Sequence, residues 1–230
     1  MPTITITGPI GSGALEVGAM LSDELGIEYI DRLILSSIAE KIGFSVTDIE
    51  NRTERAQSFS EKIAAFAQSA LERSALAGGG SDPYFGSGLD ALLIREYKDF
   101  PQQSTGDNNP LSDSNLMEVT SGVINELASN NNVIIAGRGA NIILGDRPNT
   151  YHFGLASSHK LRLSRIMQRF SVNEIEAERN LLENDQARIA YFKRFFAVDP
   201  NDPLYYHQIF NTDMLSLNQV TQSIVSLIKS

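Results

Sequence analysis

The chain has 230 residues and no cysteine, so disulfide bonds and thiolate metal sites are excluded. Its formal charge of −9 argues against general nucleic-acid binding, which needs a basic surface to displace the counterions of the phosphate backbone. Neither a long apolar run nor a basic segment followed by an apolar one is present, so we expect a soluble, cytoplasmic protein that does not associate with membranes.

A hydrophobic content of 42% predicts one compact domain with a real core. The three histidines lack the spacing of metal ligands, and we expect no protein metal site. Positive charge is uneven, because ten of the nineteen Lys and Arg residues lie between Arg138 and Arg194 and none precedes Arg32. This distribution favours either a local anionic ligand or a solvated helix face.

The first elements predict a strand, a glycine-rich loop and a helix. Residues 3–7 are β-branched throughout and predict a strand. Apolar positions recur at helical spacing from residue 14 to residue 25, and Gly26 ends that pattern as a C-terminal cap would. A short strand at 28–30 follows, after which Asp31 predicts the cap of a helix over 32–42.

The central third is predicted to contain two helices within 45–77, loops at 78–88 and 102–113, and a short helix at 89–97. The Ala-rich apolar face of the helices within 45–77 has two interpretations, which are burial against the core and contact with a second copy of the chain.

Strands and helices alternate again in the second half of the chain. The predicted elements are a helix at 116–128, a strand at 133–136, a helix ending near Leu144, a strand at 150–155, helices at 160–170 and 173–196, a strand at 208–211 and a helix at 217–228. This alternation predicts a parallel sheet with helices on both faces.

The loop after the first strand reads GPIGSGALEVG from Gly8. Gly8 and Gly13 have the spacing of the phosphate-binding pattern G-x-x-x-x-G-K-[ST], but Ala14 and Leu15 stand at the Lys and Ser/Thr positions. Backbone N–H groups and the helix dipole can bind phosphate without those side chains. The alternative is a glycine-rich turn with no ligand. Glu16 lies on the first turn of the helix, and the sequence leaves open whether its side chain faces the phosphates.

Several charged residues in the second half carry alternative interpretations. Arg138 stands between two glycines at the carboxyl end of a buried strand, where ligands of open α/β sheets bind. Arg162, Arg165 and Arg169 share one helix face, which predicts either a phosphate-binding surface or a solvated one. Asp185 and Arg188 lie one turn apart, as an exposed ion pair would.

Four segments in order resemble the cytidylate kinase-like family of P-loop nucleoside monophosphate kinases. They are ITGPIGSGALEVGAMLSDELGIEYIDRLIL at 6–35, NVIIAGRGANIIL at 132–144, KLRLSRIMQRF at 160–170 and NDQARIAYFKRFFAVDPNDPLYYHQIFNT at 184–212. The resemblance implies a three-layer α/β P-loop NTPase fold with helical monophosphate-binding and lid segments. It implies one domain, with its core at 1–44 and 115–230, a monophosphate-binding insertion at about 45–114 and a lid at about 158–185.

The resemblance also implies transfer of the γ-phosphoryl group of ATP to CMP or dCMP, with Mg²⁺ as the second cofactor. Nucleotides would then be the partners, and a homo-oligomer is a further expectation. The implied donor-phosphate residues are Gly8, Gly11, Ser12 and Gly13. The implied acceptor residues are Asp31, Arg138, Asp185 and Arg188, and the implied catalytic arginines are Arg162, Arg165 and Arg138.

Ala14 and Leu15 depart from the family pattern and leave the loop without a cation or a hydroxyl ligand for Mg²⁺. Two alternatives to the monophosphate kinase therefore remain. One is a nucleotide-binding protein that has lost catalysis, and the other is a kinase of another small acceptor.

Overall fold

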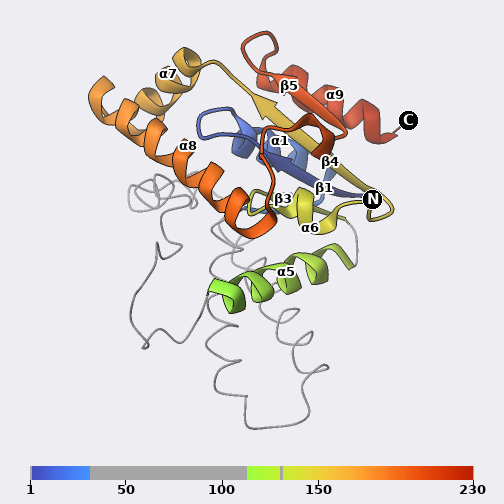
Figure 1. Cartoon of the computed structure of the whole chain (residues 1–230). Coiled ribbons are helices and arrows are strands. Elements are labelled where there is room, and N and C mark those ends of the chain that lie inside the picture. Colours follow the sequence, from blue (N-terminus) through green and yellow to red (C-terminus); the bar gives the residue numbers. More distant parts are fainter. Residues whose placement is uncertain (1, 32–112, 130–131, 230) are drawn as a thin grey trace, which may run out of the picture.

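The computed structural model describes residues 2–31, 113–129 and 132–229, and within them forms a five-stranded parallel sheet in the order β2-β3-β1-β4-β5 (Figure 1). Its strands are β1 (Thr3–Thr7), β2 (Glu28–Ile30), β3 (Val133–Ala136), β4 (Thr150–Ala156) and β5 (Gln208–Asn211). The buried, β-branched TITIT segment of β1 forms the centre of the sheet, between β3 and β4.

The described helices are α1 (Ala14–Leu25), α5 (Asp113–Ser129), α6 (Ala140–Leu144), α7 (His159–Phe170), α8 (Glu174–Phe196) and α9 (Leu217–Lys229), with a 3₁₀ turn at Pro203–Tyr205. On one face of the sheet, α1 and α9 pack through Leu21 and Ile224 against Phe153. On the other face, α5 and α6 pack through Val123 and Leu144 against Ile135. The result is a three-layer α/β fold (Figure 1).

The alternation of side chains along β3 supplies both hydrophobic layers. Ile134 belongs to the core under α1 and α9, whereas Val133 and Ile135 belong to the core under α5 and α6. All three side chains are almost fully buried. This burial on both faces explains why the segment reads as a continuous apolar run rather than as an alternating one.

All strands are parallel, so their carboxyl ends lie at the same end of the sheet. This end therefore carries the glycine loop after β1, Asp31 after β2 and the Gly137–Gly139 turn after β3. Helices α7 and α8 contact each other and lie beside the glycine loop (Figure 1). Ile10 of the loop packs with Ile166 of α7, which joins these helices to the loop.

The predicted strands and helices within the described residues are confirmed, with ends that agree closely. The largest difference is α5, which begins three residues before the predicted start at residue 116. The 3₁₀ turn was not predicted. The predicted helices and loops between 32 and 112 lie outside the described residues, and the division into core, insertion and lid stays a prediction. In the part of the chain that the structure describes, no helix is long and apolar enough to span a membrane.

Candidate active site

The glycine loop leads into the start of α1, where no side chain caps the helix. Gly13 is the N-cap of that helix in a left-handed conformation. Helix geometry leaves the first N–H groups of α1 without intrahelical acceptors, and the helix dipole is positive at this end. The same loop and helix start line a pocket. This arrangement is suited to binding an anion through the backbone.

Two arginines of α7 hold the loop by its carbonyl oxygens. Arg162 donates from Nε to the carbonyl of Ile10 at 2.7 Å. Arg165 donates from Nη1 to the carbonyls of Gly11 and Ser12, both at 3.1 Å. In a trans peptide the C=O and the following N–H point in opposite directions, so the amides of Gly11 and Gly13 point away from these arginines. The side chains of α7 thereby fix which way the loop amides face.

Thr212, at the end of β5, completes the support of the loop. Its hydroxyl accepts from Arg165 Nη1 at 3.0 Å and donates to the carbonyl of Ser12 at 2.9 Å. Thr212 is buried, as is Ser12. Sequence reasoning missed Thr212, because only the pairing of β5 with β4 brings it beside a loop two hundred residues earlier in the chain.

Arg162 is buried and carries a two-fold ion pair. Its Nη1 and Nη2 donate to the two carboxylate oxygens of Asp185 on α8 at 2.9 and 2.6 Å. Such a fork-to-fork pair fixes the guanidinium in direction as well as in position. In this arrangement Arg162 and Arg165 act on the loop backbone, and their role in phosphoryl transfer stays a prediction.

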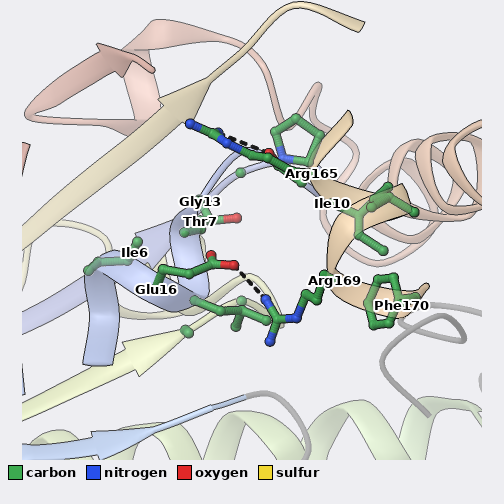
Figure 2. Close-up of a pocket in the computed structure, with 16 residues that line it drawn as sticks. Ile6, Thr7, Ile10, Gly13, Glu16, Arg165, Arg169 and Phe170 are labelled. Atoms are coloured by element: carbon green, nitrogen blue, oxygen red, sulfur yellow. Dashed lines mark hydrogen bonds and ion pairs between the residues drawn. The ribbon is translucent and has the colours of Figure 1, made fainter. Parts of the chain in front are cut away.

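The pocket beside the loop contains a second ion pair. Glu16 and Arg169 point toward each other across it (Figure 2), and Arg169 Nη1 lies 2.5 Å from Glu16 Oε1. The structure thus settles the direction of Glu16, which the sequence had left open. Arg169 was considered in the sequence only as one member of a basic helix face, and its spacing from Arg162 and Arg165 was the signal that pointed to it.

Arg138 and Asp31 lie at the carboxyl ends of neighbouring strands. Ile30 of β2 is in register with Ile135 of β3, so Asp31 lies close to the Gly137–Gly139 turn. Both Arg138 and Asp31 are buried. Arg138 has a φ of 52°, an uncommon conformation for a residue with a side chain, which strained functional turns often contain.

Helix α8 fixes this turn from the other side. The hydroxyl of Tyr191 donates to the carbonyl of Arg138 at 3.2 Å. Burial raises the pKa of Tyr191 to about 12, while the nearby Arg138 charge acts in the opposite direction. Tyr191 therefore remains a hydrogen-bond donor over the physiological pH range.

The interpretation of Asp185 and Arg188 as an exposed ion pair is wrong. Arg188 is buried, and it donates to Asn201 Oδ1 at 2.8 Å and to the carbonyl of Pro200 at 3.1 Å. Asp185 instead accepts from Arg162. The two residues lie on the same part of α8, but the first supports the glycine loop and the second holds the segment after α8.

The loop fits the phosphates of ATP better than it fits a protein-bound Mg²⁺ ion. The conformation of Gly11 and Gly13 and the uncapped start of α1 suit a phosphate chain. Leu15, in contrast, offers no oxygen at the position of the usual hydroxyl ligand. Among the described residues, no group of three or more His, Asp or Glu side chains is arranged to hold a metal ion.

Several solved structures are similar to this chain. An uncharacterised protein from Eubacterium ventriosum aligns over 100% of this chain and 99% of its own, with 16% identity and a TM-score of 0.64, which shows a shared fold. Shikimate kinase from Acinetobacter baumannii in complex with shikimate aligns over 99% and 93%, with 19% identity and a TM-score of 0.44. A gluconokinase from Sinorhizobium meliloti aligns over 99% and 91%, with 12% identity and a TM-score of 0.48.

A comparison with curated proteins gave no match. A family model, however, matches residues 3–214 and so includes the glycine loop, Arg138 and the arginines of α7. The sheet order, the loop after β1 and the helix that follows it agree with that match. On this basis the chain belongs to the cytidylate kinase-like family and has the α/β fold of P-loop kinases.

Proposed function

We propose that the protein transfers the γ-phosphoryl group of ATP to a nucleoside monophosphate, with CMP and dCMP as the first acceptors to test. The observation that carries this proposal is the glycine loop, whose carbonyl oxygens are bonded to α7 while its amides face the other way at the start of α1. Phosphoryl transfer depends mainly on positioning and on stabilising charge, and backbone amides can contribute to both.

In this proposal Gly8, Gly11 and Gly13 bind the donor phosphates through the backbone, and Ser12, whose amide donates to the carbonyl of Pro9 at 3.0 Å, holds the conformation of the loop. Arg138 and Asp31, at the ends of β3 and β2, bind the acceptor nucleotide. Asp185 and Arg188 contribute indirectly, the first through Arg162 and the second through the segment after α8. ATP supplies the transferred phosphoryl group, and Mg²⁺ offsets charge on its phosphates.

The test follows ATP with Mg²⁺ by ³¹P NMR in the presence of a panel of nucleoside monophosphates and of non-nucleotide alcohols. We expect a diphosphate product that depends on CMP or dCMP. Arg138→Ala should raise KM for the acceptor. Arg147→Ala should not, because Arg147 lies just before the amino end of β4, at the other end of the strands. Transfer to a non-nucleotide alcohol alone would replace the proposed acceptor.

A nucleotide-binding protein without turnover is the second candidate, and Ala14 and Leu15 favour it. The loop lacks the lysine that normally neutralises the β- and γ-phosphates. Under this alternative the wild-type protein binds ATP but forms no product with any acceptor, and Ala14→Lys creates measurable turnover. Turnover by the wild-type protein would exclude it.

A further inference from the structure

The missing lysine raises the question of which group supplies positive charge to the terminal phosphates. Three arginines of α7 lie near the loop. The guanidinium of Arg162 is bonded to Asp185 and to a loop carbonyl, and that of Arg165 to two loop carbonyls and Thr212. Both guanidinium groups are therefore already bonded to carbonyl oxygens of the loop.

Arg169 differs from these two in its partner, although Arg165 lines the same pocket. Arg169 lies two turns after Arg162 on α7. It lines the pocket near Glu16 (Figure 2), and Ala14 and Leu15 belong to the same lining. The guanidinium stacks near the ring of Phe170, 5.7 Å from its centroid. Its ion-pair partner Glu16 belongs to the same pocket, so the pair faces the start of α1.

Glu16 occupies a place that favours an anion. It is the third residue of α1, where the helix dipole and the free N–H groups stabilise negative charge. A phosphate group would be stabilised by the same amides and the same dipole. A carboxylate and a polyphosphate are therefore alternative partners for one arginine at one helix start.

We infer that Arg169 takes the place of the absent loop lysine, and that Glu16 pairs with it until the polyphosphate of a nucleoside triphosphate replaces the carboxylate. This inference rests on the proposed function only in that its ligand is the phosphate chain of ATP. It assigns a specific donor-binding cation to this chain, and it makes Glu16 a competitor of the ligand rather than a part of the phosphate cradle.

The first experiment measures binding of ATP, inorganic tripolyphosphate and adenosine by calorimetry at one fixed salt concentration. Arg169→Ala should weaken ATP and tripolyphosphate on the order of tenfold, or about 1.4 kcal/mol, and leave adenosine unchanged. Arg169→Lys should retain most of the affinity. Arg179→Ala, which removes an exposed arginine from α8, is the control for net charge. Equal affinities in Arg169→Ala and Arg179→Ala would overturn the inference.

The second experiment is a double-mutant cycle with Glu16→Gln. Removal of the Glu16 carboxylate should raise tripolyphosphate affinity several-fold when Arg169 is present, because the ligand then no longer competes with Glu16 for the guanidinium of Arg169. The same substitution should have a smaller effect in the Arg169→Ala background. Equal effects in both backgrounds would show that Glu16 acts only through general repulsion and would contradict the competition.

The two proposals fail in different ways. A wild-type protein that binds ATP through Arg169 but forms no diphosphate product would refute phosphoryl transfer and leave this inference standing. Turnover that is unchanged by Arg169→Ala, with unchanged affinity for ATP, would refute the inference alone. A wild-type protein that binds neither ATP nor tripolyphosphate would refute both.

Discussion

Arg165 shows how a charged side chain can orient a loop through its backbone carbonyl oxygens. Its guanidinium donates to the carbonyls of Gly11 and Ser12 and to the hydroxyl of Thr212. Each carbonyl that it holds turns the following amide to the opposite side of the backbone. The orientation of the loop therefore depends on α7 and on the end of β5 as well as on its glycines.

We predict that Arg165→Ala lowers the free energy of unfolding by about 2–3 kcal/mol, because hydrogen bonds from a charged donor contribute more than neutral ones. Urea denaturation followed by circular dichroism measures this change. Arg179→Ala, at an exposed position, should change stability by less than about 0.5 kcal/mol. Similar losses in the two variants would mean that the contacts of Arg165 with the loop add no stability.

His152 is the buried titratable group of β4. Its ring contacts Thr5 Oγ1 through Nδ1 and the carbonyl of Gly145 through Nε2, each at 2.7 Å. Because a carbonyl can only accept, Nε2 carries the proton in the neutral ring. Burial lowers the pKa of His152, and nearby His207 lowers it further, although the carbonyl of Gly145 and the charge of Asp146 act in the opposite direction.

The lowered pKa of His152 predicts a loss of stability in mild acid. The unfolded chain takes up a proton at this residue near pH 6.5, whereas the native state takes it up only at lower pH. The contribution is therefore complete above about pH 6.5, falls as the pH drops below that value, and is lost once the pH passes through the native pKa. Urea denaturation at several pH values should show a weaker dependence in His152→Gln, and equal dependence in both proteins would contradict this assignment.

At the scale of single residues, the sequence indicated which residues belong to the candidate site better than it indicated which residues they bond to. Arg138 could be identified because a bulky cation between two glycines has few packing explanations. The pairing of Arg162 with Asp185, and of Glu16 with Arg169, could not be derived, because each pair joins two elements whose relative position depends on the whole fold.

At the scale of elements, the close contact between α7 and the loop leaves no room for a side chain at Gly11. Gly11 has a φ of 77°, and a Cβ at this position would lie 2.9 Å from the backbone oxygen of Arg162. Gly26, after α1, has a φ of 64°, but a Cβ there would meet no atom within 4 Å. The two glycines thus share the backbone strain of a left-handed conformation and differ in their surroundings.

We predict that Gly26→Ala destabilises the protein by about 1–2 kcal/mol, the cost of the left-handed conformation alone. Gly11→Ala should cost more, because the backbone of α7 must move to admit the methyl group. Chemical denaturation gives the stabilities of both variants, and tripolyphosphate binding shows whether the loop is displaced. If the Gly11→Ala protein is as stable as the Gly26→Ala protein, the displacement of α7 that admits the methyl group costs little free energy.

Helix and strand boundaries were predictable where local chemistry determines them. The run of β-branched residues in β1 and the glycine after α1 define their elements with little help from tertiary contacts. The 3₁₀ turn at Pro203–Tyr205 was not predictable in the same way, because three residues carry no periodic pattern. The order of the strands likewise depends on pairing between distant segments, for which a single sequence has no direct signal.

At the scale of the whole molecule, the candidate site connects both ends of the chain. The loop follows β1, its arginines come from α7, and Thr212 follows β5, which pairs at the far edge of the sheet. The molecule is acidic overall, with a formal charge of −9, yet it places three arginines around one loop. A ligand held by these parts therefore binds the native arrangement and not the unfolded chain.

This linkage predicts that ATP stabilises the entire fold. A ligand present at 100 times its Kd adds about 2.7 kcal/mol to the free energy of unfolding when it binds only the native state. For a domain of this size, that amount corresponds to a rise of about 5–11 °C in Tm. Thermal unfolding with increasing ATP measures it, with adenosine as the ligand that lacks phosphates. The shift should shrink in Arg169→Ala. Because that variant retains the loop and its support by Arg165, the part of the residual shift that exceeds the shift with adenosine would report the contribution of the loop to phosphate binding. An unchanged Tm at ATP concentrations that saturate binding would mean that ATP binds the unfolded chain as tightly as the native one, and would contradict a binding site formed by the fold.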